Sequence, residues 1–133
     1  MKRKGSFELV KEYLADMGMY IVEEDSRNQL VVVEKESEGI KNMIVDCEEP
    51  VVIIEQLIMK VKPDSCAFFR RLLQMNRELV HGAFVLDESG EMLLFRDTLQ
   101  LENLDFNELE GSVKSLSLAM SEYGSELLEY AAG

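Results

Sequence analysis

The residues that could carry nucleophilic chemistry are two cysteines and one histidine. Cys66 is expected in the first turn of a helix, where the positive end of the helix dipole favours a thiolate. His81 follows the far end of that helix, which at ~1.5 Å per residue is roughly 22 Å away. The two side chains are therefore not expected to touch. Cys47 and Cys66 lack C-x-x-C spacing, so we interpret both as reduced, buried thiols.

Two polar clusters could bind a ligand or catalyse a reaction, but each has a simpler interpretation. Asp46, Glu48 and Glu49 carry the oxygen ligands that a hard cation prefers. In a chain with 26 acidic residues, we interpret them as a solvated loop between strands. The run Arg96-Asp97-Thr98 is expected to turn the chain towards the last helix. Neither a glycine-rich phosphate loop nor a G-x-S-x-G motif is present, so the sequence predicts no enzyme and no cofactor.

Length, composition and charge limit the possible classes of function. The 133 residues are 47% hydrophobic and 30% charged, which predicts one folded domain over residues 1–133. The net charge of −12 argues against nucleic acid and anionic membranes as partners, because both attract basic surfaces. One histidine and two cysteines exclude a multi-histidine metal centre and a four-cysteine zinc site. No apolar signal-peptide core follows the basic start, and no apolar run is long enough to span a bilayer, so we expect a cytoplasmic protein.

Hydrophobic periodicity predicts a sheet with N-terminal, central and C-terminal helices. The first helix has an apolar face that includes Val10 and Leu14 and stops at Gly18. The last helix begins at the N-cap Asp105, and its apolar stripe is expected to pack on the sheet or, alternatively, to form a dimer seam. The expected strands span residues 19–24, 29–35, 40–47, 51–61, 83–87 and 91–96. The order α-β-β-β-(β)-α-β-β-α is typical of an α+β domain with a mostly antiparallel sheet.

The central helix is expected to open at Pro63 and Asp64, with proline stopping the preceding strand and aspartate capping the helix. Asn76 is the one polar member of its predicted apolar stripe. A buried amide without partners is costly, so we expect Asn76 to hydrogen-bond the backbone at the helix end. The stripe comprises Phe69, Leu72, Leu73, Asn76 and Leu79.

Residues 51–61 are the first candidate for a partner surface, because both faces of this strand are apolar. We expect one face to pack on the core and the other to meet a second chain, either a sister subunit or a client. The more polar set is assigned to the outside: Val52, Ile54, Gln56, Ile58 and Lys60. Residues 60–77 carry a local charge of +4 and residues 102–133 one of −6, so these regions can attract each other within a protomer or across a dimer. The candidate partner or dimer surface is therefore Val52, Ile54, Ile58, Arg70 and Arg71.

Residues 72–109 carry a pattern of structural residues: L-L-x-x-N at 72–76, His81-Gly82 before a hairpin, Gly90 within it, and Leu104-Asp105 at the last helix. This pattern resembles the YbjN domain family, which is similar in turn to the class I type III secretion chaperones of the Tir type. The resemblance implies a bacterial α-β-β-β-α-β-β-α protomer that forms homodimers. In the secretion chaperones, the dimer holds an extended effector segment on apolar grooves without ATP.

Pattern and resemblance together indicate a non-enzymatic, chaperone-like homodimer that holds a partner polypeptide on apolar sheet or helix surfaces. The alternative is a regulatory module that binds a small ligand between the sheet and the helices. Such a pocket needs a few convergent polar groups. The sequence does not reveal such groups.

Overall fold

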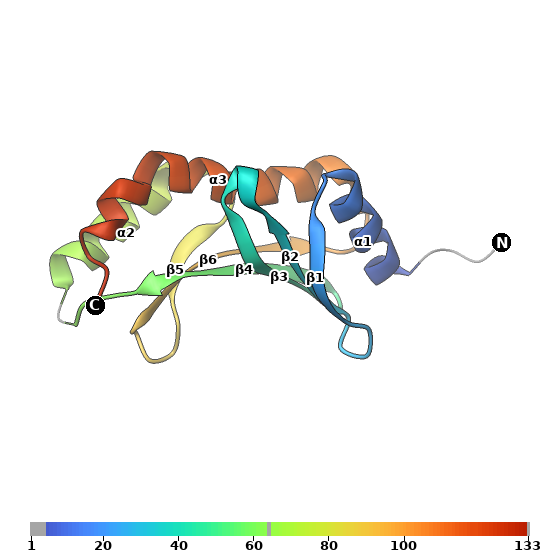
Figure 1. Ribbon diagram of the computed structural model, residues 1–133, viewed down its shortest axis with the longest axis horizontal. Helices are drawn as coiled ribbons and strands as arrows, with labels where there is room; N and C mark the ends of the chain where they lie inside the picture. The colour runs from blue at the N-terminus through green and yellow to red at the C-terminus, as the bar shows by residue number, and fades with distance from the viewer. Residues whose placement is uncertain (1–4, 64, 133) are drawn as a thin grey trace.

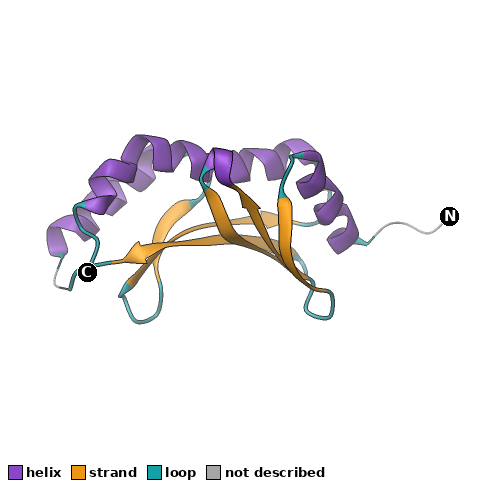
Figure 2. Cartoon of the chain, in the orientation of Figure 1, coloured by secondary structure: helices purple, strands orange, loops and turns teal. Residues whose placement is uncertain are grey.

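The computed structural model describes residues 5–63 and 65–132, which form an antiparallel sheet with α-helices on one face (Figures 1 and 2). The helices are α1 (Ser6–Asp16), α2 (Cys66–Glu78) and α3 (Phe106–Leu128). The strands are β1 (Tyr20–Asp25), β2 (Leu30–Lys35), β3 (Ile40–Glu48), β4 (Val51–Lys60), β5 (Ala83–Leu86) and β6 (Met92–Gln100). Within these residues, no helix is long and apolar enough to cross a membrane.

The strand order is β1-β2-β3-β4-β6-β5, and each neighbouring pair is antiparallel. This arrangement confirms the predicted α+β class with a mostly antiparallel sheet. Four strands precede α2, whereas the resemblance implied three, because residues 51–60 form the separate, central strand β4. β6 extends to Gln100, so Arg96, Asp97 and Thr98 lie within a strand and do not turn the chain as predicted.

The core lies between the inner face of the sheet and the helices. Side chains alternate along each strand, so Val31 and Val33 of β2 point towards the helices. α3 runs across this face and buries the greater part of its predicted stripe, including Leu109, Leu116 and Leu127. The expectation that the last helix packs on its own sheet is therefore confirmed.

The predicted stop after α1 and the predicted N-cap of α3 are confirmed, whereas the N-cap of α1 is Gly5 and Ser6 is its first residue. Gly18 follows α1 with a φ of +81°, a left-handed conformation that favours glycine. At the start of α3, the Asp105 carboxylate accepts a hydrogen bond from the Glu108 N–H at 2.8 Å. The side chain thereby satisfies one of the free N–H groups at the beginning of the helix.

The predicted apolar stripe of α2 is confirmed only in part: Leu72 is buried, and Phe69 and Leu79 pack against the core. The helix buries Phe68, Leu72 and Met75, whereas Leu73 is 72% exposed. Phe68 stacks on Tyr130 with ring centroids 4.3 Å apart, and this contact near the end of α3 holds Phe68 in the core, while Phe69 is partly buried beside it. The predicted cap Asp64 lies outside the described residues.

Candidate polypeptide-binding surfaces

The residues considered for nucleophilic chemistry are separated in the fold. Cys66 is exposed at the start of α2, which corrects the prediction of a buried thiol, and Cys47 is buried in β3. Burial, together with the neighbouring carboxylates of Asp46 and Glu49, raises the pKa of the Cys47 thiol to about 11, so it stays protonated at neutral pH. His81 packs beside Gly111 of α3, where an added Cβ would lie 3.5 Å from its Nε2. The described residues therefore give no Cys–His pair.

The acidic residues at the end of β3 carry no arrangement suited to a metal. Partial burial, reinforced by the charge of Glu48, raises the pKa of the Asp46 carboxyl. In the described part of the chain, no three His, Cys, Asp or Glu side chains gather closely enough to hold a metal ion. Asp97, the other polar candidate, accepts a hydrogen bond from the buried Ser112 hydroxyl at 2.7 Å and so ties β6 to α3.

The outer face of the sheet carries aliphatic side chains that no helix covers, because the helices lie on the opposite face (Figure 1). Leu57 of β4 is 53% exposed and Ile44 of β3 is 38% exposed. Between these side chains, Glu55 and Arg96 form an ion pair at 3.1 Å. The strand register extends the aliphatic set to neighbouring strands, and we call the whole set the outer sheet face: Val32, Ile44, Ile53, Leu57, Val85 and Leu94.

The structure corrects the phase predicted for residues 51–61. Val52 and Ile54 are 0% and 1% exposed and point into the core, so neither can belong to a partner surface on this protomer. Ile58 follows a register shift in β4 and is partly buried against the core. In the phase assigned to the inside, Val51, Ile53 and Leu57 lie on the outer face, as Glu55 does. After the register shift, Met59 and Val61 pack on the core as predicted.

Gln56 explains this error. It lies in the same phase as Ile54 and is buried, because its amide bonds the turn before β3. Its Oε1 accepts from the Lys41 N–H at 3.1 Å, and its Nε2 donates to the Gly39 carbonyl at 3.3 Å. Gln56, buried with both partners satisfied, and Lys60, exposed at the end of the strand, made the inner phase look like the more polar one, although the charged Glu55 lies in the outer phase.

The two arginines of the predicted surface have different environments. Arg71 donates two hydrogen bonds to the Glu126 carboxylate, at 2.6 and 3.1 Å, which joins α2 to α3. These bonds lower the pKa of Glu126. The predicted attraction between the basic and acidic regions thus operates within the protomer. Arg70 is exposed and forms no ion pair with a described residue.

The two edges of the sheet also differ. On the β5 edge, Asn76 of α2 donates from Nδ2 to the Phe84 carbonyl at 3.0 Å and accepts from the Phe84 N–H at 2.8 Å. The predicted backbone role of Asn76 is confirmed, with a strand as its partner and not the helix end. Asn76 thereby occupies two groups that a foreign strand would otherwise pair with. On the β1 edge, no described strand pairs with Tyr20–Asp25 on the side away from β2.

The space between the sheet and the helices is largely filled by side chains. A cavity beside Met17, Met19 and Val113 measures about 20 Å³, and a cavity between α2 and β5 measures about 250 Å³, whereas ligand pockets measure roughly 300–1,000 Å³. In the described residues, every buried side-chain nitrogen and oxygen atom has a hydrogen-bond partner. No buried polar group there is left for a small ligand to satisfy.

The CesT_Tir_1 family model matches residues 3–133. This chain belongs to the CesT_Tir_1 family. No curated protein matches its sequence. The fold of this CesT_Tir_1 member is nevertheless shared with several solved structures.

YbjN from E. coli, a candidate transcription regulator, superimposes with a TM-score of 0.68 at 16% identity over 93% of this chain and 94% of YbjN. The chaperone SchA, solved in a chaperone–effector complex with HopA1, superimposes with a TM-score of 0.61 at 13% identity and covers 86% of this chain and 89% of SchA. The type III secretion chaperone SycH from Yersinia pestis, solved with a fragment of YscM2, superimposes with a TM-score of 0.58 at 13% identity, over 88% of this chain and 98% of SycH. The CesT_Tir_1 member thus has the fold of YbjN and of secretion chaperones, as its sequence pattern predicted.

Proposed function

We propose that this CesT_Tir_1 protein is a non-enzymatic, cytoplasmic, chaperone-like homodimer that binds a segment of a partner polypeptide. The observation that supports this proposal is the outer sheet face, which stays uncovered in the protomer although six aliphatic side chains lie on it. The solvated face of an antiparallel sheet is ordinarily polar, since alternation separates core side chains from solvent side chains. An aliphatic set at this position marks a contact surface.

The arrangement of the outer sheet face suits an extended chain. Leu57, Leu94 and Val85 lie directly opposite one another on β4, β6 and β5, and Val32 and Ile44 form a second group on β2 and β3. A polypeptide that crosses the sheet would meet apolar side chains at both ends of its path. The Glu55–Arg96 pair between the groups offers polar partners for its backbone.

The similar structures support the same proposal. SchA and SycH are both solved with polypeptide partners. This protomer has the same fold and an uncovered apolar face. The net charge of −12 keeps such a surface soluble while it awaits its partner.

The test combines Ile44→Asp with Leu57→Asp. We expect the unmodified protein to have about twice the 15.2 kDa protomer mass by light scattering and to suppress the aggregation of reduced insulin. The double variant should lose both properties and keep its far-UV circular dichroism, since both positions point to solvent. Leu128→Asp, at a similarly exposed leucine near the end of α3, is the matched control and should change neither property.

Two results would contradict the proposal: an unmodified protein that is monomeric and does not suppress aggregation, or a double variant that behaves as the control does. Ile54→Asp separates the two faces of β4. Because Ile54 is buried, this change places an unpaired carboxylate in the core and should unfold the protomer.

A further inference from the structure

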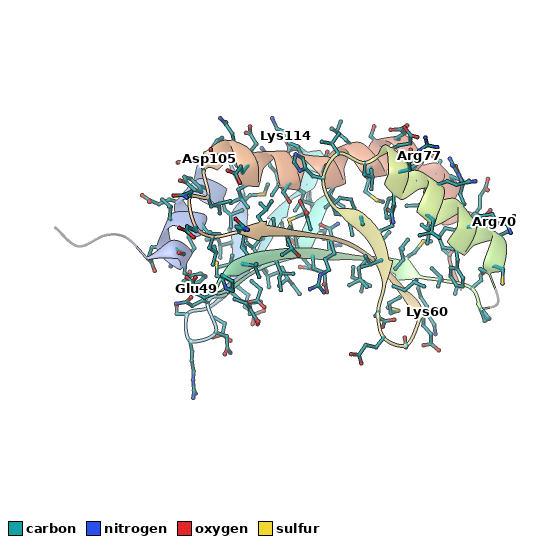
Figure 3. The ribbon with its side chains drawn as sticks, turned by 180° about the vertical axis from the view of Figure 1, so that it is seen from behind. Glu49, Lys60, Arg70, Arg77, Asp105 and Lys114 are labelled. Carbon is teal, nitrogen blue, oxygen red and sulfur yellow. The ribbon has the colours of Figure 1, made fainter. Side chains whose placement is uncertain are left out.

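Basic side chains without an acidic partner gather at one end of this acidic protein. The described residues hold six Lys or Arg side chains that form no ion pair with a described residue: Arg27, Lys41, Lys60, Lys62, Arg70 and Arg77. Four of the six lie on or beside α2. Figure 3 shows Arg70 and Arg77 along α2 and Lys60 below it, whereas Glu49 and Asp105 lie at the opposite end of the molecule.

Two adjoining cavities that meet at Phe69 lie beside these cations: Lys60 and Lys62 line one of them, and Arg70 and Arg77 belong to α2, which forms a wall of the other. One cavity, of about 250 Å³, lies between α2 and β5 and is lined mainly by apolar side chains, including Phe69, Leu72 and Leu86. The other, of about 510 Å³, extends towards the β5–β6 hairpin and is lined by Lys60 and Lys62 among others, with Glu91 as an acidic wall residue. We call the two together the α2 trough.

The apolar part of the α2 trough has an exposed anchor point. Leu73 lines it and is 72% exposed, because α2 buries the adjacent phase through Phe68 and Leu72. Arg70 and Arg77 lie three residues before and four residues after Leu73, so helical spacing places both at the solvent side of the same wall. An apolar side chain beside Leu73 would therefore have a guanidinium group on either side.

The β5 edge adds backbone groups to this wall. The Phe84 N–H and C=O are bonded to Asn76 and therefore point away from β6. Alternation along a strand directs the N–H and C=O of Leu86, two residues later, to the same edge, and Leu86 lines the trough. A segment in extended conformation can pair with this edge while its side chains reach Leu73.

We propose that the α2 trough binds an extended, acidic-aliphatic segment of a partner polypeptide. Its aliphatic side chains occupy the apolar part beside Leu73, and its carboxylates pair with Arg70, Arg77 and Lys60. Charge complementarity selects this occupant, since four of the six described cations without an ion pair either line the trough or lie on α2, on a protein of net charge −12. This site shares Val85 of the edge strand with the outer sheet face but does not depend on the function proposed for that face.

The probe is a fluorescein-labelled peptide of alternating Leu and Glu, with a Leu/Lys peptide of equal length as its counterpart. We expect the Leu/Glu peptide to raise the fluorescence anisotropy on binding, with an affinity that falls as salt is added, and the Leu/Lys peptide to bind at least about tenfold more weakly. Arg70→Glu with Arg77→Glu should weaken binding of the Leu/Glu peptide by roughly tenfold, through two lost attractions and two new repulsions. Arg27→Glu with Lys41→Glu makes the same charge change elsewhere and should alter the affinity by less than about twofold.

A second measurement needs no charge variant. Cys66 is exposed one turn before Phe69 and Arg70, so a bound Leu/Glu peptide should slow its alkylation in the unmodified protein. The variant Ile44→Asp with Leu57→Asp should bind this peptide normally, which distinguishes the trough from the outer sheet face.

Several results would overturn the proposal. The first is an equal loss of affinity for the Leu/Glu peptide in both charge-reversed double variants. The second is equal affinity for the Leu/Lys and Leu/Glu peptides, and the third is alkylation of Cys66 at the same rate with and without the Leu/Glu peptide. The fourth is binding of a single-stranded oligonucleotide without binding of the Leu/Glu peptide. Conversion of a dimer into monomers by Arg70→Glu with Arg77→Glu would also overturn it, since the occupant would then be a second copy of this chain.

Discussion

Asn76 joins the end of α2 to the edge strand β5, and its replacement tests whether this amide is structural. Asn76→Leu keeps a side chain of similar size and removes both hydrogen bonds to Phe84, of 2.8 and 3.0 Å. The Phe84 side chain is buried, and its N–H and C=O lose their protein partners at the edge of the α2 trough. An unsatisfied buried polar group costs about 1–3 kcal/mol. The adjoining trough admits water to this edge, so we expect a total loss of about 2–3 kcal/mol in the free energy of unfolding.

The expected shift in melting temperature follows from the size of the chain. Unfolding entropy is about 2.1 cal/mol/K per residue, or roughly 0.28 kcal/mol/K for 133 residues. Each kcal/mol then lowers the melting temperature by about 3–4 °C, and Asn76→Leu should lower it by roughly 7–11 °C in a calorimetric scan. Gln74→Leu is the matched control, because this amide is exposed on the same helix, and its effect should stay within about 0.5 kcal/mol.

Asn76→Asp sharpens the test through its pH dependence. An ionised carboxylate accepts from the Phe84 N–H but repels the Phe84 carbonyl, whereas a protonated carboxyl can donate to it. The neutral form is favoured in the fold, so the pKa of this carboxyl should lie above its value in the unfolded chain. Its stabilising contribution is then complete below the unfolded pKa and is lost as the pH rises through the folded one. The deficit in the free energy of unfolding relative to the unmodified protein should therefore shrink in acid.

The structural role of Asn76 would be refuted if Asn76→Leu kept the melting temperature of the unmodified protein but lost partner binding. Asn76 would then be a binding residue.

Two further predictions concern single positions. Gly82 has a φ of +76°, and a Cβ added there would lie 2.5 Å from the Phe95 ring, so Gly82→Ala should destabilise the fold by about 2–5 kcal/mol in denaturant titration. Gly90 has a similar φ of +75° but no atom within 4 Å of an added Cβ, so Gly90→Ala should cost only about 1–2 kcal/mol. Equal losses of stability in the two variants would contradict the predicted clash. Iodoacetamide at pH 8 should label Cys66 within minutes and leave Cys47 unlabelled until denaturant is added, because Cys47 is buried with a pKa of about 11; mass spectrometry that finds both thiols labelled equally would contradict that burial.

Local signals in the sequence predicted the parts of the fold that depend on one or two residues. Gly18 ends α1 because a left-handed residue is needed there, and Asp105 caps α3 because its carboxylate reaches the Glu108 N–H. Asn76 was expected to bond backbone because it interrupts an apolar stripe. Its partner, Phe84, could not be named from the sequence, since the contact depends on how α2 lies along the edge of the sheet.

The phase of α2 depended on a contact between elements distant in the sequence. The pairs Phe68-Phe69 and Leu72-Leu73 allow two adjacent stripes that are equally apolar. Tyr130, more than fifty residues later, decides between them by stacking on Phe68. The choice leaves Leu73 in solvent between two arginines, and this is why the α2 trough was not found from sequence periodicity.

β4 presents the same difficulty in a strand, and there the error has a functional consequence. Each phase of residues 51–58 holds three aliphatic residues and one polar residue, Glu55 or Gln56, so alternation does not say which face is inside. Polarity was a poor guide, because Gln56 is buried with both ends of its amide satisfied, whereas Leu57 is exposed. A buried polar side chain costs little folding free energy when a neighbouring turn supplies its hydrogen-bond partners. An exposed aliphatic side chain is favoured where a partner chain covers it. Gln56, which favoured the outer assignment of its phase, is therefore a structural residue of the inner face. The outer sheet face is formed by the other phase, which includes Leu57.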